Sequence, residues 1–150
     1  VNGVAQDISA NAAGVDVSWQ QKLNDKLNMI VEAEYIGGNN VNSFISSSDS
    51  LKEISSYKMN GYFGQFLFRY NIDIPGLKTL ELGGKFEHTD PLSSDDLDQF
   101  NTITGGIGFI FLPDNTVRLQ LNMVHTGYTE NASDAFRNFN YFVAQLQLKI

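Results

Sequence analysis

The sequence contains no cysteine, only 3 prolines and a single tryptophan in 150 residues. Without cysteine there is no disulfide, no thiolate ligand for zinc or an iron–sulfur centre, and no thiol nucleophile. A basic excess is also missing, since 10 Lys and Arg stand against 17 Asp and Glu, a net charge of −7. Because a nucleic-acid binder needs a basic face to meet phosphate, the charge argues against a nucleic-acid partner.

Long apolar runs and helical periodicity are missing too. No segment approaches the roughly 20 apolar residues of a membrane-spanning helix. The first residues do not have the pattern of a secretory signal, and the chain begins at Val1. The length is that of one domain, enough for a single core or a small closed barrel, so we treat residues 1–150 as one unit.

The chain has instead a repeated alternation of apolar and polar residues. It is clearest at residues 117–123, where Val, Leu, Leu and Met alternate with Arg, Gln and Asn. The pattern recurs in six further segments: residues 15–20, 26–35, 62–72, 80–87, 103–111 and 141–150. Because successive side chains of a strand point to opposite faces, the alternation predicts an all-β fold of about seven antiparallel strands.

The predicted strands are long, and their connections alternate in length. Most strands run about 10 to 13 residues, whereas about 5–6 is usual in globular sheets and about 9–11 tilted residues cross a bilayer. Short connections at 23–25, 73–77 and 113–115 alternate with long ones at 37–57, 89–99 and 128–138. Outer-membrane barrels sort their connections in this way. The sequence therefore predicts an antiparallel transmembrane β-barrel in the outer membrane of a Gram-negative bacterium.

Aromatic residues near the strand ends agree with such a barrel. They are expected to form an interfacial girdle against the lipid bilayer and lipopolysaccharide. The predicted girdle residues are Tyr35, Tyr62, Tyr70, Phe111, Tyr128 and Tyr141.

The number of strands raises a question about the rest of the barrel. Bacterial single-chain barrels have an even number of strands and both ends in the periplasm, whereas seven strands are seen here. Residues 1–13 are therefore expected to be the remnant of an extracellular loop, and the chain to be the C-terminal part of a larger barrel. The alternative is a complete eight-stranded barrel with a structural or surface-binding role and no open channel, since eight strands enclose only side chains.

The polar faces of the strands carry the candidate functional residues. We expect a set of charged side chains to line the lumen: Arg69, Lys85, Arg118, Lys149, Glu32, Glu34, Glu81 and Glu87. With Lys26 and Asp16, which share this parity, five cations stand against five acids, so no basic funnel is predicted. The alternative is that these charges pair with one another across neighbouring strands.

Several segments of the last half of the chain resemble the phosphate-selective porin family, of the porin O and P type. They are Leu80–Asp90, Thr104–Asn115, Val117–Val124 and Gln145–Ile150, together with Gly61–Gln65. The resemblance implies the C-terminal portion of a roughly 16-stranded porin that forms a homotrimer. It also implies passive diffusion of small hydrophilic solutes or anions, including phosphate, without a cofactor.

Other chemistry finds little support in the residues. His88 and His125 are expected to pack at the membrane interface rather than to share a metal ion. The acidic residues Asp90, Asp95, Asp96 and Asp98 lack the spacing of a calcium loop, which favours a solvated loop. Serines at 46–48 and 93–94 have only His88 near them in sequence, so no catalytic residue, metal or cofactor is predicted. A lipid-modifying barrel and a soluble lipocalin-like binder, with its apolar face turned inward, are the remaining alternatives.

Overall fold

The computed structural model describes residues 11–40, 57–93, 99–111, 117–128 and 138–149, which form one seven-stranded sheet. Its strands are β1 (Ala12–Lys22), β2 (Leu27–Asn39), β3 (Lys58–Ile74), β4 (Leu77–Asp90), β5 (Phe100–Ile110), β6 (Val117–Tyr128) and β7 (Phe139–Leu148). The prediction of an all-β fold with seven antiparallel strands is confirmed. Among the described residues, no helix is long and apolar enough to span a membrane.

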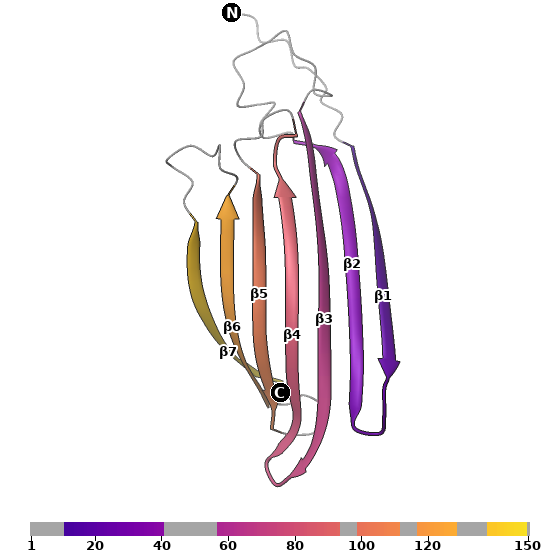
Figure 1. Cartoon of the computed structure of the whole chain (residues 1–150), viewed down its shortest axis with the longest axis vertical. Helices are drawn as coiled ribbons and strands as arrows, with labels where there is room; N and C mark the ends of the chain where they lie inside the picture. Colours follow the sequence, from indigo (N-terminus) through magenta and orange to yellow (C-terminus); the bar gives the residue numbers. More distant parts are fainter. Residues whose placement is uncertain (1–10, 41–56, 94–98, 112–116, 129–137, 150) are drawn as a thin grey trace, which may run out of the picture.

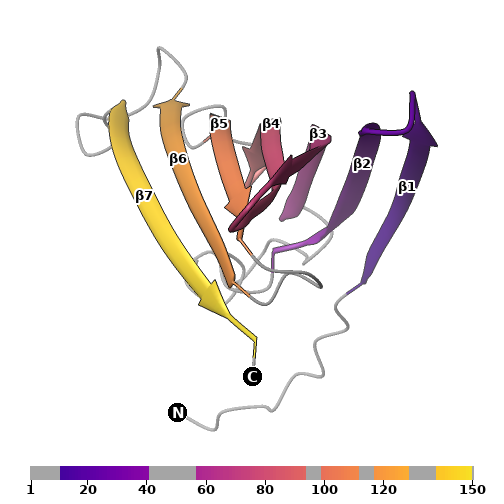
Figure 2. The same ribbon diagram turned by 90° about the horizontal axis from the view of Figure 1, so that it is seen from below.

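The strands pair in the order of the sequence, each antiparallel to the next (Figure 1). The sheet is curved, and within the described residues no pairing joins β1 to β7, so it is open at both edges (Figure 2). β1 begins at Ala12, so Ala12 and Ala13 belong to a strand and not to the loop remnant expected over residues 1–13. Residues 1–10 of that segment lie outside the described residues.

The short connections all lie at one end of the sheet and the long ones at the other (Figure 1). In the turn between β1 and β2, the side-chain oxygen of Asn24 accepts hydrogen bonds from the backbone N–H groups of Lys26 and Leu27, each 2.9 Å long. The turn between β3 and β4 contains Gly76 with φ of 87°, a conformation that a side chain would strain. These two turns thus have the local chemistry that a tight reversal needs.

The register keeps residues of one kind on one face across the whole sheet. Val31 lies opposite Phe66, which lies opposite Gly84, and the same apolar parity continues through β5, β6 and β7. Large exposed apolar residues of this face come from every strand: Val15, Val17, Trp19, Val31, Tyr35, Tyr62, Phe66, Tyr70, Leu82, Phe86, Ile103, Ile107, Met123, Phe142, Leu146 and Leu148. We call this surface the apolar face.

The opposite surface, the polar face, is the more crowded of the two. Four of the buried strand residues lie on it, in β4, β5 and β6: Glu81, Ile110, Val124 and Thr126. Asp90, the last residue of β4, is also buried and has the parity of the apolar face. No second layer of described residues covers this face. Side chains on an uncovered sheet become buried only where the sheet curves around them, so the polar face is the concave one.

Candidate functional site

A cluster of three charged side chains crosses the middle strands of the polar face. Glu81 in β4 is only 1% exposed and accepts hydrogen bonds from two arginines. The Nε of Arg69 in β3 lies 2.8 Å from Oε1 of Glu81, and Nη2 of Arg118 in β6 lies 2.5 Å from Oε2. Both carboxylate oxygens are thus neutralised by charge-assisted bonds, and the cluster keeps one net positive charge.

Glycine in the intervening strand β5 makes the cluster possible. Glu81 lies opposite Gly108, and Arg118 lies opposite Ile110, so Arg118 must reach across β5 to meet Glu81. A Cβ atom placed on Gly108 would lie 2.7 Å from Oε2 of Glu81 and 3.1 Å from its Cβ. Gly106 is covered in the same way, since its Cβ would lie 2.0 Å from the side-chain oxygen of Asn122. These two glycines leave room for side chains from β4 and β6 to lie flat on the sheet.

Other charged side chains of the polar face also have partners on the sheet. Nζ of Lys85 lies 2.7 Å from Oε1 of Glu87 in the same strand and 4.4 Å from the ring centre of Phe63. Glu32 accepts hydrogen bonds from the side chains of Gln65 and Ser18 on its two neighbouring strands. Pairing of charges across strands, the alternative stated for the predicted lumen residues, describes Glu81 with Arg69 and Arg118, whereas Lys85 pairs within its own strand and Glu32 pairs with uncharged side chains.

The polar face has a shallow depression of about 290 Å³ around this cluster. Its polar-face lining residues are Gln65, Leu67, Glu81, Gly83, Lys85, Thr104, Gly106, Gly108, Arg118, Gln120 and Asn122. Sequence reasoning did not single out the amides of this set. Their shared parity with the charged residues is the signal that would have found them.

The predicted lumen residues occupy the expected face of the strands. Seven of them lie in register on the polar face: Arg69, Lys85, Arg118, Glu32, Glu34, Glu81 and Glu87. The eighth, Lys149, follows the last residue of β7 and is exposed. The structure brings Arg69, Glu81 and Arg118 into contact. It pairs Lys85 with Glu87 and places Glu34 directly opposite another acid, Asp16.

The predicted girdle aromatics fall into two groups. Tyr35 lies directly opposite Tyr62 on the apolar face, and the Tyr62 ring stacks on His88 at 4.8 Å. Two others have the parity of the apolar face near the short turns: Tyr70 and Phe111. The last two have the parity of the polar face: Tyr128, which packs on Phe100, and Tyr141, which packs on Phe139.

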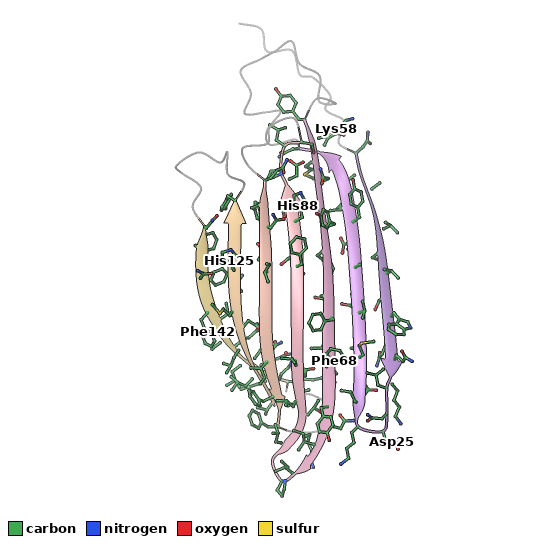
Figure 3. The ribbon with its side chains drawn as sticks, in the orientation of Figure 1. Asp25, Lys58, Phe68, His88, His125 and Phe142 are labelled. Atoms are coloured by element: carbon green, nitrogen blue, oxygen red, sulfur yellow. The ribbon has the colours of Figure 1, made fainter. Side chains whose placement is uncertain are left out.

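The two histidines lie on the apolar face toward the long-connection ends of β4 and β6 (Figure 3). Nδ1 of His88 lies 2.9 Å from Oδ1 of Asn101, and Nδ1 of His125 lies 2.7 Å from Oδ1 of Asn140. In each case the asparagine is the directly opposite residue on the next strand. Both histidines are therefore held in cross-strand pairs.

The acidic and serine segments are described only in part. Asp90 is buried and accepts a hydrogen bond from Asn60, whose side-chain nitrogen also donates to Ser93. Three acidic residues of the same predicted loop lie outside the described residues, as do four serines: Asp95, Asp96, Asp98, Ser46, Ser47, Ser48 and Ser94. In the described part of the chain, no group of three or more His, Cys, Asp or Glu is arranged to hold a metal ion.

Comparison with known proteins assigns the chain to no family. A scan against protein-family models finds no match, and a search of curated proteins finds no similar sequence. The resemblance to the phosphate-selective porins stays a prediction from the residues. Function must be argued from the two faces of the sheet.

Proposed function

We propose that the sheet is part of the wall of a transmembrane β-barrel, a porin of a Gram-negative outer membrane. One observation carries the proposal: the concave face buries a carboxylate while the convex face exposes large apolar side chains on all seven strands. Leu82 is 58% exposed and Phe142 is 66% exposed. Water disfavours so extended an apolar surface, whereas acyl chains accept it without loss.

The height of the apolar face agrees with a bilayer. Leu27 near the short turns and Tyr35 near the long connections are eight residues apart on the same face of β2. Eight residues extend about 27 Å along a strand, or about 21 Å along the axis of a barrel whose strands tilt by about 40°. The apolar band of an outer-membrane barrel is about 25 Å tall.

The strand ends are staggered as a tilted barrel wall requires. Paired residues connect Phe139, the first residue of β7, through the intervening strands to Glu34 in β2. Glu34 is five residues before Asn39, the last residue of β2. Figure 1 shows the upper ends of the strands descending from β3 to β7. Five residues of rise over five strand spacings give a stagger of about 35°, close to the usual tilt of barrel strands.

The direction of the edge strands limits how such a barrel closes. β1 and β7 both run from the long-connection end to the short-turn end. Pairing them directly would make a parallel contact in an otherwise antiparallel sheet. Antiparallel closure therefore requires an odd number of further strands between them, as in a barrel of 8 or of roughly 16 strands.

The proposed activity is passive diffusion of small hydrophilic solutes through a water-filled lumen. The polar face supplies amide, hydroxyl and charged groups of both signs to that water. Preference for anions such as phosphate, and assembly as a trimer, are proposals that depend on the family resemblance alone. A soluble lipocalin-like barrel is less well supported, because its ligand would need the apolar side chains on the crowded concave face.

The single tryptophan allows a direct test of the membrane wall. Trp19 is 49% exposed on the apolar face of β1. When the protein is folded into vesicles, bromine atoms on the acyl chains should quench Trp19 fluorescence, and aqueous iodide should not. The matched control is a double variant, Trp19→Phe with Thr104→Trp, which moves the indole to the polar face and should reverse both results. Quenching of Trp19 by iodide alone would contradict the proposal and support the soluble alternative.

Planar-bilayer recording separates the open porin from the plugged barrel. A porin should give discrete conductance steps that last as long as the protein stays inserted. A folded, heat-modifiable protein that inserts but conducts no current would support the small eight-stranded barrel, whose interior charges are packed against one another.

A further inference from the structure

Charges of like sign gather at different levels of the polar face. Between the middle of the strands and the long connections, Asp16 lies opposite Glu34, and Glu34 shares a register row with Glu87. Glu32 is two residues from Glu34 on the same face, and Lys85 is the one cation among them in the described residues. We call Asp16, Glu32, Glu34 and Glu87 the acidic band.

The half of the polar face nearer the short turns is basic. Its cations form the basic band: Lys22, Lys26, Arg69, Arg118 and Lys149. Two acids accompany them. Glu81 lies between Arg69 and Arg118, and Asp25 pairs with Lys22 at 2.8 Å in the turn between β1 and β2.

The two bands are far enough apart to act separately. In β1, Asp16 precedes Lys22 by six residues, and in β2, Glu34 follows Lys26 by eight residues. The nearest members of the two bands are Glu32 and Arg69, since Glu32 lies opposite Gln65, four residues before Arg69. These intervals are about 14–27 Å along a strand and about 10–21 Å along a tilted barrel axis. The Debye length is about 10 Å at 0.1 M salt and about 3 Å at 1 M. At the lower salt, the bands are thus about one to two Debye lengths apart, so each sets the sign of the excess ions beside it.

We propose that this separation makes the channel rectify ionic current, an inference that rests on the proposed porin function. With the long-connection side positive, cations enter past the acidic band and anions enter past the basic band. Both kinds of ion then accumulate between the bands and the conductance rises. With the opposite polarity, both are drawn out of this zone, and the conductance falls. Current should therefore be larger when the long-connection side is positive.

Single-channel recording of the protein in planar bilayers tests the proposal. In about 0.1 M KCl, the ratio of currents at opposite voltages of about 100 mV should lie clearly above 1, and in about 1 M KCl it should fall to about 1. The orientation of each channel follows from a Leu23→Cys variant, since the chain has no other cysteine. Biotin on this turn residue binds streptavidin only from the chamber that the short turns face.

Two substitutions with the same change of charge give opposite expected results. Glu34→Gln removes a charge from the acidic band and should lower the current ratio. Asp25→Asn removes an acid at the short-turn end, which is exposed and far from the acidic band, and should raise the ratio. A change of the ratio in the same direction for both variants would overturn the proposal, because only net charge would then matter.

The failure of this inference is distinguishable from the failure of the proposed function. If the folded protein inserts and conducts no current, the porin proposal is wrong. If it conducts with equal currents at both voltages in low salt, the porin proposal stands and the rectification proposal is wrong. A ratio above 1 with the larger current at the opposite polarity also overturns the rectification proposal, because the bands predict its sign.

Discussion

At the scale of single residues, Glu81 has the environment least expected from its neighbours in sequence. Its strand alternates regularly, which predicts a solvated carboxylate, yet the structure buries it between Arg69 and Arg118. An ionised carboxylate is costly to bury unless it is paired and hydrogen-bonded on both oxygens. Glu81 therefore holds the two arginines close to the sheet. Gly108 leaves the space in which Arg118 and Glu81 come into contact.

The first prediction concerns this cluster. Glu81→Gln should lower the free energy of unfolding by about 2–3 kcal/mol, because it leaves two partly buried arginines without their counter-charge. Urea unfolding of the protein folded in lipid vesicles measures this. Glu87→Gln is the matched control, since its pair with Lys85 is more exposed, and it should cost less than about 1 kcal/mol. Equal effects of the two substitutions would contradict the role given to Glu81.

At the scale of one element, β4 shows how the strands distinguish the two faces. Its apolar parity carries Leu80, Leu82 and Phe86, and its polar parity carries Glu81 and Lys85. Leu82 lies between Phe68 and Ile107 of the neighbouring strands, near the middle of the apolar face. A soluble sheet would expose this position to water, whereas a barrel wall would expose it to acyl chains.

The second prediction uses this difference. Leu82→Arg should lower the free energy of unfolding from vesicles by about 2–4 kcal/mol, the cost of an arginine at the bilayer midplane. At a water-exposed position, the same substitution would change stability by about 0.5 kcal/mol or less. Thr104→Arg on the polar face of β5 is the control and should have a small effect. A small effect at Leu82 as well would argue against a lipid-facing surface.

At the scale of the whole molecule, the polar face carries equal numbers of acidic and basic residues, but these are unevenly distributed along the strands. The polar face carries cations and acids in equal number by the count of the sequence, which predicts weak ion selectivity. Folding nevertheless separates the signs along the strands and ties Arg118 and Lys85 to acidic partners. In the proposed channel, ion selectivity should therefore depend on which pairs are broken rather than on net charge alone.

The third prediction tests the contribution of these two cations. Replacing both Arg118 and Lys85 by Gln should shift the reversal potential of the channel toward cations, because Glu81 and Glu87 lose a partner each. The measurement is the reversal potential in a salt gradient across a planar bilayer. The control is Lys78→Gln, since Lys78 alternates onto the other side of β4 from Thr79 and Glu81. An unchanged reversal potential with intact conductance would mean that these side chains do not line the path.

Much of the fold follows from the sequence because side-chain direction in a strand is a local property. Alternation at 117–123 is enough to predict the two faces of β6, and the Asn24 and Gly76 turns mark where chains reverse. The prediction of seven antiparallel strands needed no more than this. The bounds were less well predicted, and Ala12 and Ala13 prove to be part of β1, because their pairing with β2 is not visible in the sequence.

The sequence by itself determined the strands, the order of long and short connections, and the parity of each charged residue. Only the tertiary structure decided which charges meet, because the register between strands joins residues far apart in the chain. Arg118 reaches Glu81 across a glycine that belongs to a third strand. The acidic and basic bands likewise arise when five strands and their flanking residues are aligned. Equal numbers of acidic and basic residues are thus separated into two bands only when the whole sheet is assembled.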